Sequence, residues 1–245
     1  LSVNKKKRTL TIADNGIGMN REELIENLGT IARSGTSAFV DQLTGDSEQD
    51  LAMIGQFGVG FYSGFVVADE VTVTSRKAGE TKSWEWKSDG EGEFSITDAE
   101  REGRGTTITL HLKKGEKEFL ESLRIRNIVK RYSDHIAIPV ILAGGGDDGA
   151  DDKLNEASAL WTRPKSEIKT DQYTEFYHHV AAAFDTPWTT LHVRAEGKIE
   201  YTMLLYVPST RPFDLFHPER QSRLKLYVKR VFITDDCEGL VPSYL

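Results

Sequence analysis

The sequence predicts an α+β fold, in which a two-layer sandwich of helices on an antiparallel sheet is followed by the first part of an α/β domain. Three observations support this prediction. Apolar and polar residues alternate in several short runs between residues 70 and 112, the period of strands with one buried face. Apolar residues at helical spacing precede those runs. A short acidic segment, 144–153, interrupts a chain whose 245 residues suit two domains.

A strand and a capped helix open the chain. Residues 9–12 alternate and favour a strand, and Asn20 begins a helix because Glu23, three residues later, completes a capping box. Apolar residues then recur at helical spacing as far as residue 32; they are Leu24, Leu28 and Ile31.

Two further helices are expected before the sheet. A short one around residues 39–43 is followed by an acidic loop tip at 45–50. A glycine-rich loop, 55–64, then leads into an apolar helix that ends near residues 68–69.

The sheet is predicted as an antiparallel meander separated by glycine-rich turns. Its strands alternate around these residues: Val71 and Val73, Trp84 and Trp86, Phe94 and Ile96, and 107–112. A helix over 119–135 and a closing strand over 137–142 follow it.

Residues 144–153 are small and acidic, which is typical of a flexible linker between domains. The second domain is predicted to contain a helix, strands and a loop. The expected bounds are a helix at 170–184, strands near 191–193, 201–207 and 224–233, and a loop at 208–218.

Charge and composition exclude several classes of function. The net charge of −7, from 31 basic and 38 acidic residues, argues against a nucleic-acid-binding surface. A single cysteine, Cys237, suits a reducing compartment such as the cytoplasm. No apolar run approaches a membrane span and no signal peptide opens the chain, so we expect no membrane contact. Because the chain begins with Leu1 next to a strand, we expect it to be a fragment.

Three glycine motifs are the candidate site. Asp14-x-Gly16-x-Gly18 could place a carboxylate against the amino group of adenine, although a plain turn explains it about as well. Gly55-x-x-Gly58-x-Gly60 before a helix could bind phosphate, or could serve only tight packing. It has neither the lysine of a P-loop nor the pattern of a dinucleotide fold. The turn that ends in Gly105-Thr106 is equally consistent with a simple hairpin.

Taken together, the order and spacing of these motifs resemble the ATP site of the gyrase, histidine-kinase and mismatch-repair ATPase superfamily. Residues 28–36, 54–63 and 227–233 look like the ninety-kilodalton heat-shock chaperone family. Residues 160–163, 175–177 and 212–216 look like the middle domain of that family, and the short acidic linker is similar to its bacterial members. The resemblance covers essentially the whole chain.

The resemblance implies an ATP-binding domain at 1–143, a linker at 144–153 and the start of a middle domain that contacts clients and phosphate at 154–245. It implies ATP or ADP with Mg²⁺ as ligand. Asp14 would accept from the adenine amino group, Gly18, Met19 and Thr106 would line the base pocket, and Asn27 would contact the sugar–phosphate side. The residues expected around the phosphates are Arg33, Gln56, Phe57, Gly58, Val59, Gly60 and Phe61. Residues 30–55 would form a lid with Gly29 and Gly55 as hinges.

The resemblance further implies an ATP-dependent chaperone that assists protein folding under heat shock and other stress, with unfolded proteins as clients and a homodimer in the full-length protein. The catalytic glutamate, the magnesium-binding asparagine and the phosphate-sensing arginine of the family fall outside this chain, and residues 1–13 contain no acidic residue. We therefore expect this chain to hydrolyse ATP hardly at all. We also expect apolar surface on the helix of Leu24, Leu28 and Ile31 to be exposed.

Alternatives from other classes are a histidine-kinase or gyrase-type ATPase subunit on the same fold, and a binding scaffold without nucleotide. No metal site is expected at His178 and His179, because adjacent helical residues point about 100° apart. Cys237 is expected to be structural, and Trp188 could belong either to the core or to an exposed client patch.

Overall fold

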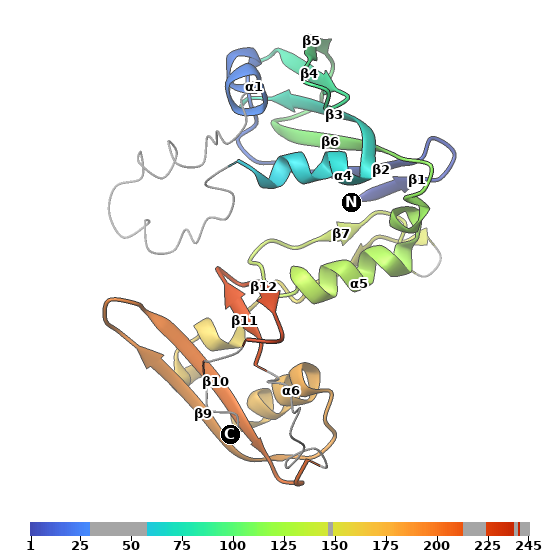
Figure 1. Cartoon of the computed structure of the whole chain (residues 1–245). Coiled ribbons are helices and arrows are strands. Elements are labelled where there is room, and N and C mark those ends of the chain that lie inside the picture. Colours follow the sequence, from blue (N-terminus) through green and yellow to red (C-terminus); the bar gives the residue numbers. More distant parts are fainter. Residues whose placement is uncertain (30–57, 147–148, 213–223, 238–239, 241–245) are drawn as a thin grey trace. The chain divides into compact units, whose positions relative to one another are not determined.

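The structure is a computed structural model that describes residues 1–29, 58–146, 149–212, 224–237 and 240 (Figure 1). The chain folds into two compact units. The first comprises Leu1–Lys130 and Val140–Leu154, and the second Arg131–Pro139 and Asn155–Leu245. The predicted domain limits remain a prediction.

The first unit is built on a six-stranded sheet in which all neighbours are antiparallel, in the order β1-β2-β6-β3-β4-β5. Its strands are β1 (Ser2–Asn4), β2 (Thr9–Ala13), β3 (Ala68–Arg76), β4 (Ser83–Ser88), β5 (Phe94–Ala99) and β6 (Gly105–Leu112). The helices among its described residues are α1 (Arg21–Leu28), the 3₁₀ turn η1 (Gly60–Ser63), α4 (Gly64–Val67), the 3₁₀ turn η2 (Lys117–Leu120) and α5 (Ser122–Tyr132), whose last two residues fall in the second unit.

The position of β6 departs from the predicted meander. Strands β3, β4 and β5 do follow one another, but β6 lies between β2 and β3 rather than beside β5. A central place suits its apolar residues, since Leu110 and Leu112 are buried there. The register pairs Ala13 with Thr107 and Ser75 with Thr106, so the end of β2 and the end of β3 flank the start of β6.

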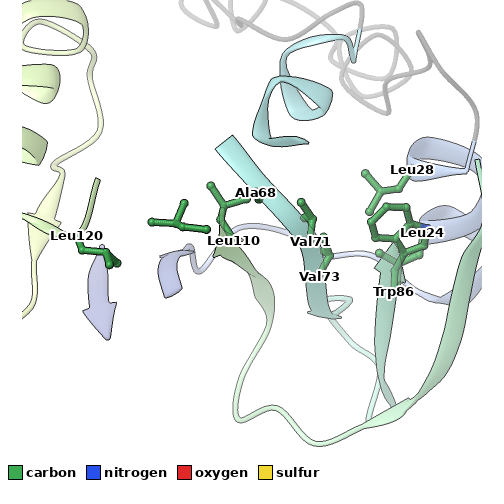
Figure 2. Close-up of a cluster of buried hydrophobic side chains, with 9 residues drawn as sticks. Leu24, Leu28, Ala68, Val71, Val73, Trp86, Leu110 and Leu120 are labelled. Atoms are coloured by element: carbon green, nitrogen blue, oxygen red, sulfur yellow. The ribbon is translucent and has the colours of Figure 1, made fainter. Parts of the chain in front are cut away.

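The core of the first unit lies between one face of the sheet and the helices. Figure 2 shows Leu24 and Leu28 of α1 beside Trp86 of β4. The expectation that these leucines are exposed is wrong: Leu24 is 0% and Leu28 9% exposed, because both pack on the sheet itself. Ile31 lies outside the described residues. The opposite face of the central strands carries threonines such as Thr72 and Thr109, which pair across β3 and β6.

The predicted capping box of α1 is confirmed. The Asn20 side chain accepts from the Glu23 N–H at 3.0 Å, and the Glu23 carboxylate accepts from the Asn20 N–H at 3.0 Å. Two N–H groups that the first turn of a helix leaves without partners are thereby satisfied. This fixes where the chain turns from the end of β2 into α1.

The segment expected to be a flexible linker contains a hairpin. Strand β7 (Ile141–Leu142) pairs with β8 (Asp152–Lys153), and between them the Gly146 N–H donates to the Ala150 carbonyl at 2.8 Å. Leu142 and Leu154 are buried against α5 and hold both ends of the segment in the first unit. The described residues of 144–153 are therefore tied to folded structure. Only the last two residues of the predicted strand 137–142 are in a strand.

The second unit contains one α-helix, two hairpins and two 3₁₀ turns among its described residues (Figure 1). They are η4 (Leu160–Thr162), η5 (Lys165–Glu167), α6 (Thr170–Ala181), β9 (Pro187–Ala195), β10 (Tyr201–Pro208), β11 (Leu226–Val228) and β12 (Val231–Thr234). The prediction of one strand over 224–233 is wrong, because Lys229 and Arg230 have positive φ and form a hairpin turn. Trp188, left open by the sequence, is 77% exposed.

Asp185, which follows α6, has a carboxyl group whose pKa is clearly shifted. Its carboxylate accepts from the Tyr177 hydroxyl at 2.8 Å and from the Thr210 N–H and both Ser209 donors at 3.0–3.1 Å. The Tyr177 bond, followed by the Thr210 bond, lowers the pKa of Asp185 to about 2. Burial and the same hydrogen bond raise the pKa of Tyr177 to about 12.

This shift predicts an acid dependence of stability. Because the pKa of Asp185 is lower in the folded state than its ordinary value of 3.8, the unfolded state binds more protons between these values. The stabilisation is complete above pH 4 and is lost as the pH falls toward 2. Urea unfolding of the second unit, followed by near-ultraviolet circular dichroism, should show this loss in the wild type and a weaker one in Asp185→Asn. Equal pH dependence in both proteins would contradict the assignment.

Candidate functional site

The Asp14 carboxylate stands at the end of β2 with one oxygen occupied. Oδ1 accepts from the Gly16 N–H at 2.8 Å and from the Thr106 N–H at 3.1 Å, while the Asp14 N–H donates to the Thr106 carbonyl at 2.8 Å. Within the described ranges no protein donor reaches Oδ2. The side chain is thus oriented by the backbone and keeps one charged acceptor for a ligand donor.

Two glycines allow the chain beside Asp14 to approach its neighbours closely. Gly18 has φ +70°, and a Cβ there would lie 1.9 Å from the Arg76 carbonyl oxygen at the end of β3. Gly105 has φ +116°, and its Cβ would lie 2.2 Å from the Asp14 carbonyl oxygen. No other residue type fits either position. The Asp14–Met19 turn is therefore held directly against the ends of β3 and β6.

A network of buried hydroxyl groups is hydrogen-bonded to the Asp14–Met19 turn. Ser75 Oγ lies 2.9 Å from Thr106 Oγ1, is 3.1 Å from the Gly105 carbonyl, and accepts from the Met19 N–H at 2.8 Å. Sequence reasoning found Thr106 and Met19 but missed Ser75. The sequence does contain a signal for Ser75, which lies on the same buried face of β3 as Val71 and Val73. A polar residue at a buried strand position needs hydrogen-bond partners.

Arg101 is a second residue that sequence reasoning missed. Its guanidinium donates to the carbonyls of Gly103 and Arg104 at 2.8 and 2.7 Å, and to the Asp14 carbonyl at 2.8 Å. It therefore closes the β5–β6 loop and ties this loop to the backbone of Asp14. No sequence pattern marks an arginine in a charged loop for such a role.

The helix α1 contributes Asn27. Its Nδ2 lies 4.0 Å from Met19 Sδ, so these two predicted site residues are neighbours, both half-buried. The structure therefore links Asp14, Thr106 and Met19 through hydrogen bonds that include Ser75, holds Gly18 of the same turn against Arg76, and places Asn27 beside Met19.

The second glycine loop is described from Gly58 onward. Gly58 has φ +65°, and Val59 is exposed. Gly60 begins the 3₁₀ turn η1, which α4 extends to Val67, so the helical stretch ends near the predicted place. The Tyr62 hydroxyl donates to the Leu28 carbonyl at 3.1 Å and links this loop to the end of α1.

Of the residues predicted around the phosphates, Phe61 is described by the structure and three others are not. The Phe61 ring packs edge-on against Trp86 at 5.7 Å between centroids and belongs to the core, so a ligand could meet this residue only through its backbone. Arg33, Gln56 and Phe57 lie outside the described residues, as does the predicted lid with its hinge Gly55.

This arrangement can bind a flat ligand that presents a donor. A charged acceptor, a close-fitting glycine turn and a half-buried methionine lie where β2 and β3 end and β6 begins, in an antiparallel sheet covered by helices. Residues 1–118 match the family of histidine kinase-, DNA gyrase B- and Hsp90-like ATPases. Fold and site therefore define the first unit as an ATPase domain of this type, an α+β sandwich.

The rest of the chain matches a more specific protein family. Residues 147–245 match the Hsp90 protein family. The chaperone protein HtpG of Paramagnetospirillum magneticum is 64% identical over 98% of this chain, and that of Rhodospirillum rubrum is 62% identical over the whole of this chain. The HtpG of Rickettsia prowazekii is 58% identical, again over the whole chain. The chain belongs to the Hsp90 family. It spans 38–40% of the length of these relatives.

Among the described residues, no helix is both long and apolar enough to cross a membrane.

Proposed function

We propose that this chain is the nucleotide-binding part, with the start of the middle domain, of an ATP-dependent chaperone that assists protein folding. The observation that carries the proposal is the Asp14 carboxylate, whose Oδ1 is held by two backbone N–H groups while Oδ2 has no protein donor within the described part of the chain. It sits in a domain that matches an ATPase family.

The chemistry of this carboxylate favours adenine over guanine held in the same orientation. Adenine presents an exocyclic amino group next to a ring acceptor, whereas guanine presents a carbonyl oxygen at the same position. A carboxylate oxygen binds the amino group and repels the carbonyl. Gly18, Met19 and Thr106 would line the base pocket, and the half-buried Asn27 would meet the sugar–phosphate side.

The phosphates of ATP or ADP, with Mg²⁺, would lie toward the second glycine loop. There the backbone of Gly58, Val59, Gly60 and Phe61 would provide N–H donors, together with Arg33, Gln56 and Phe57. Bound nucleotide supplies the energy of a phosphoanhydride. The residues of this chain bind and orient it, and we propose that they hydrolyse it hardly at all by themselves.

The proposed cellular role follows from the relatives. The three compared are named chaperones, and the match of residues 147–245 to Hsp90 favours a chaperone over a kinase or gyrase subunit. We propose that the whole protein is an ATPase whose lid closes over the nucleotide, that it acts as a homodimer on unfolded or partly folded clients, and that it works in the cytoplasm without binding nucleic acid or membranes.

Titration calorimetry of the chain with ADP and with GDP, both with Mg²⁺, tests the proposal. ADP should bind saturably with one site per chain. GDP should bind at least ~100-fold more weakly, because a site built for a hydrogen bond rejects an analogue that leaves its acceptor facing another acceptor.

Two results would contradict the proposed function. Equal affinities for ADP and GDP would show that Asp14 does not read the base. If neither nucleotide bound while the unfolding transition of the first unit was intact, the chain would instead be a scaffold without nucleotide.

A further inference from the structure

The second unit brings together three potential metal ligands that are far apart in the sequence. Asp134 and His135 lie in the segment that follows α5, and His179 lies in the last turn of α6. One ligand atom of each residue lies within 4.8 Å of those of the other two, and this is the one such group of three within the described ranges. The spacing around His178 and His179 could not reveal this group of three, because His135 lies 44 residues before His179 in the sequence (179 minus 135).

Asp134 is oriented by contacts on both carboxylate oxygens. Oδ1 accepts from the Glu156 N–H at 3.0 Å, and Oδ2 lies 3.1 Å from His179 Nε2. The Asp134 carbonyl also accepts from the Ala157 N–H at 3.1 Å. The carboxylate is therefore held toward the His179 ring, with one oxygen fixed by the backbone.

His135 is oriented in the way that metal-binding histidines commonly are. Its Nδ1 lies 2.9 Å from the Ser158 carbonyl oxygen, which can only accept, so Nδ1 carries the hydrogen. In that tautomer Nε2 is the nitrogen with ligand character. A backbone carbonyl on the far nitrogen is the contact that fixes ring and tautomer at many metal centres.

The surroundings of the cluster combine a shielded interior with an open side. Asp134 and His135 are 3% and 4% exposed, and the rings of Trp161, Phe176 and Tyr227 have centroids within 4.8–5.7 Å of that of His135. The His179 side chain is 49% exposed. A low dielectric strengthens the attraction between a carboxylate and a cation, and the exposed histidine gives an ion a way in.

We propose that Asp134, His135 and His179 bind a divalent transition-metal ion of the zinc type. Two imidazole nitrogens and one carboxylate oxygen, with solvent in a fourth position, suit Zn²⁺, whereas Mg²⁺ and Ca²⁺ prefer oxygen ligands alone. Ligand atoms of one zinc ion lie at most about 4 Å apart, so small side-chain rotations must bring the three ligand atoms, now within 4.8 Å of one another, closer together. The ion replaces the hydrogen between His179 Nε2 and Asp134 Oδ2, and His179 then carries its proton on Nδ1.

The test is a titration of the chain with ZnCl₂ by calorimetry and with CoCl₂ by visible absorption, because low-coordinate Co²⁺ has characteristic ligand-field bands. The matched variants are His179→Gln and His178→Gln. These residues are adjacent on the same helix, but His178 Nε2 lies 2.8 Å from the Asp185 carbonyl oxygen and outside the cluster. One Zn²⁺ per chain should bind, and His179→Gln should weaken binding at least about 10-fold, the lower limit for loss of a mere supporting contact.

His178→Gln and Cys237→Ser should leave the zinc affinity unchanged. Because His179 is half exposed, its variant should unfold like the wild type without metal, which separates loss of a ligand from loss of the fold. Absence of saturable Zn²⁺ binding by the wild type would overturn the proposal. So would equal weakening by the two histidine variants, or loss of the cobalt bands in Cys237→Ser. Nucleotide binding by the first unit does not enter any of these outcomes.

Discussion

Asp14→Asn is expected to weaken ADP binding about 100-fold. The substitution removes a charged acceptor and places an amide N–H₂ where the adenine amino group would donate. Loss of a charge-assisted hydrogen bond costs about 1.5–3 kcal/mol, and a donor left without an acceptor adds about 1–3 kcal/mol. The lower part of the combined range, about 3 kcal/mol, corresponds to about 100-fold in the dissociation constant. Calorimetric titration with ADP and Mg²⁺ measures this directly.

The fold should tolerate this change, because the asparagine Oδ1 can still accept from the Gly16 and Thr106 N–H groups that Asp14 satisfies. Asp89→Asn is the matched control. Asp89 also accepts from the N–H two residues ahead, that of Glu91 at 2.9 Å, in an exposed turn of the same unit. Its variant should bind ADP like the wild type. Equal weakening by both variants would assign the effect to charge and not to base recognition.

Gly18→Ala is expected to destabilise the first unit by about 2–5 kcal/mol. A left-handed backbone costs alanine about 1–2 kcal/mol, and forced repacking adds about 1–3 kcal/mol. The added Cβ would lie 1.9 Å from the Arg76 carbonyl oxygen, so the turn or the end of β3 must move. Thermal unfolding followed by circular dichroism should show a midpoint lower by about 2–4 °C for each kcal/mol. ADP affinity should fall as well, since the turn holds Asp14.

Gly79→Ala separates the cost of the left-handed backbone from the cost of the close contact with Arg76. Gly79 has φ +83° in the same unit, but a Cβ there meets no atom within 4 Å. Its variant carries the backbone cost alone and should lose only about 1–2 kcal/mol. If Gly18→Ala were no worse than Gly79→Ala, the close contact with Arg76 would not hold the site.

Much of the first unit could be predicted from local patterns. Alternation located strands β2 to β6 within a few residues, and the Asn20–Glu23 capping box placed the start of α1. Positions that only glycine can occupy marked the Asp14–Met19 turn. These predictions succeeded because each depends on residues within a few positions of one another, whose conformational preferences act wherever the segment lies.

Two other features could not be predicted from the sequence, because they depend on contacts between distant residues. The pattern of β11 and β12 reads as one strand because lysine and arginine rarely take positive φ, yet Lys229 and Arg230 do. The acidic composition of 144–153 suggested a flexible linker, but Asp152 and Lys153 at its end pair with strand β7, and the buried Leu142 and Leu154 flank the segment. In both cases contacts with the rest of the fold outweigh a weak local preference.

By itself, the sequence determined the approximate places of strands β2 to β6, the alternation of apolar residues along them, and that an aspartate and two glycines share one turn. Only the tertiary structure decided that β6 enters between β2 and β3. This placement sets Thr106 against Asp14, 92 residues away, and Ser75 against Thr106. Alternation specifies a strand's buried face but not its neighbour, because neighbours are chosen by how the whole apolar surface is covered at once. The contact of Arg101 with the Asp14 carbonyl, and in the second unit the meeting of His179 with Asp134 and His135, likewise join residues far apart in the sequence.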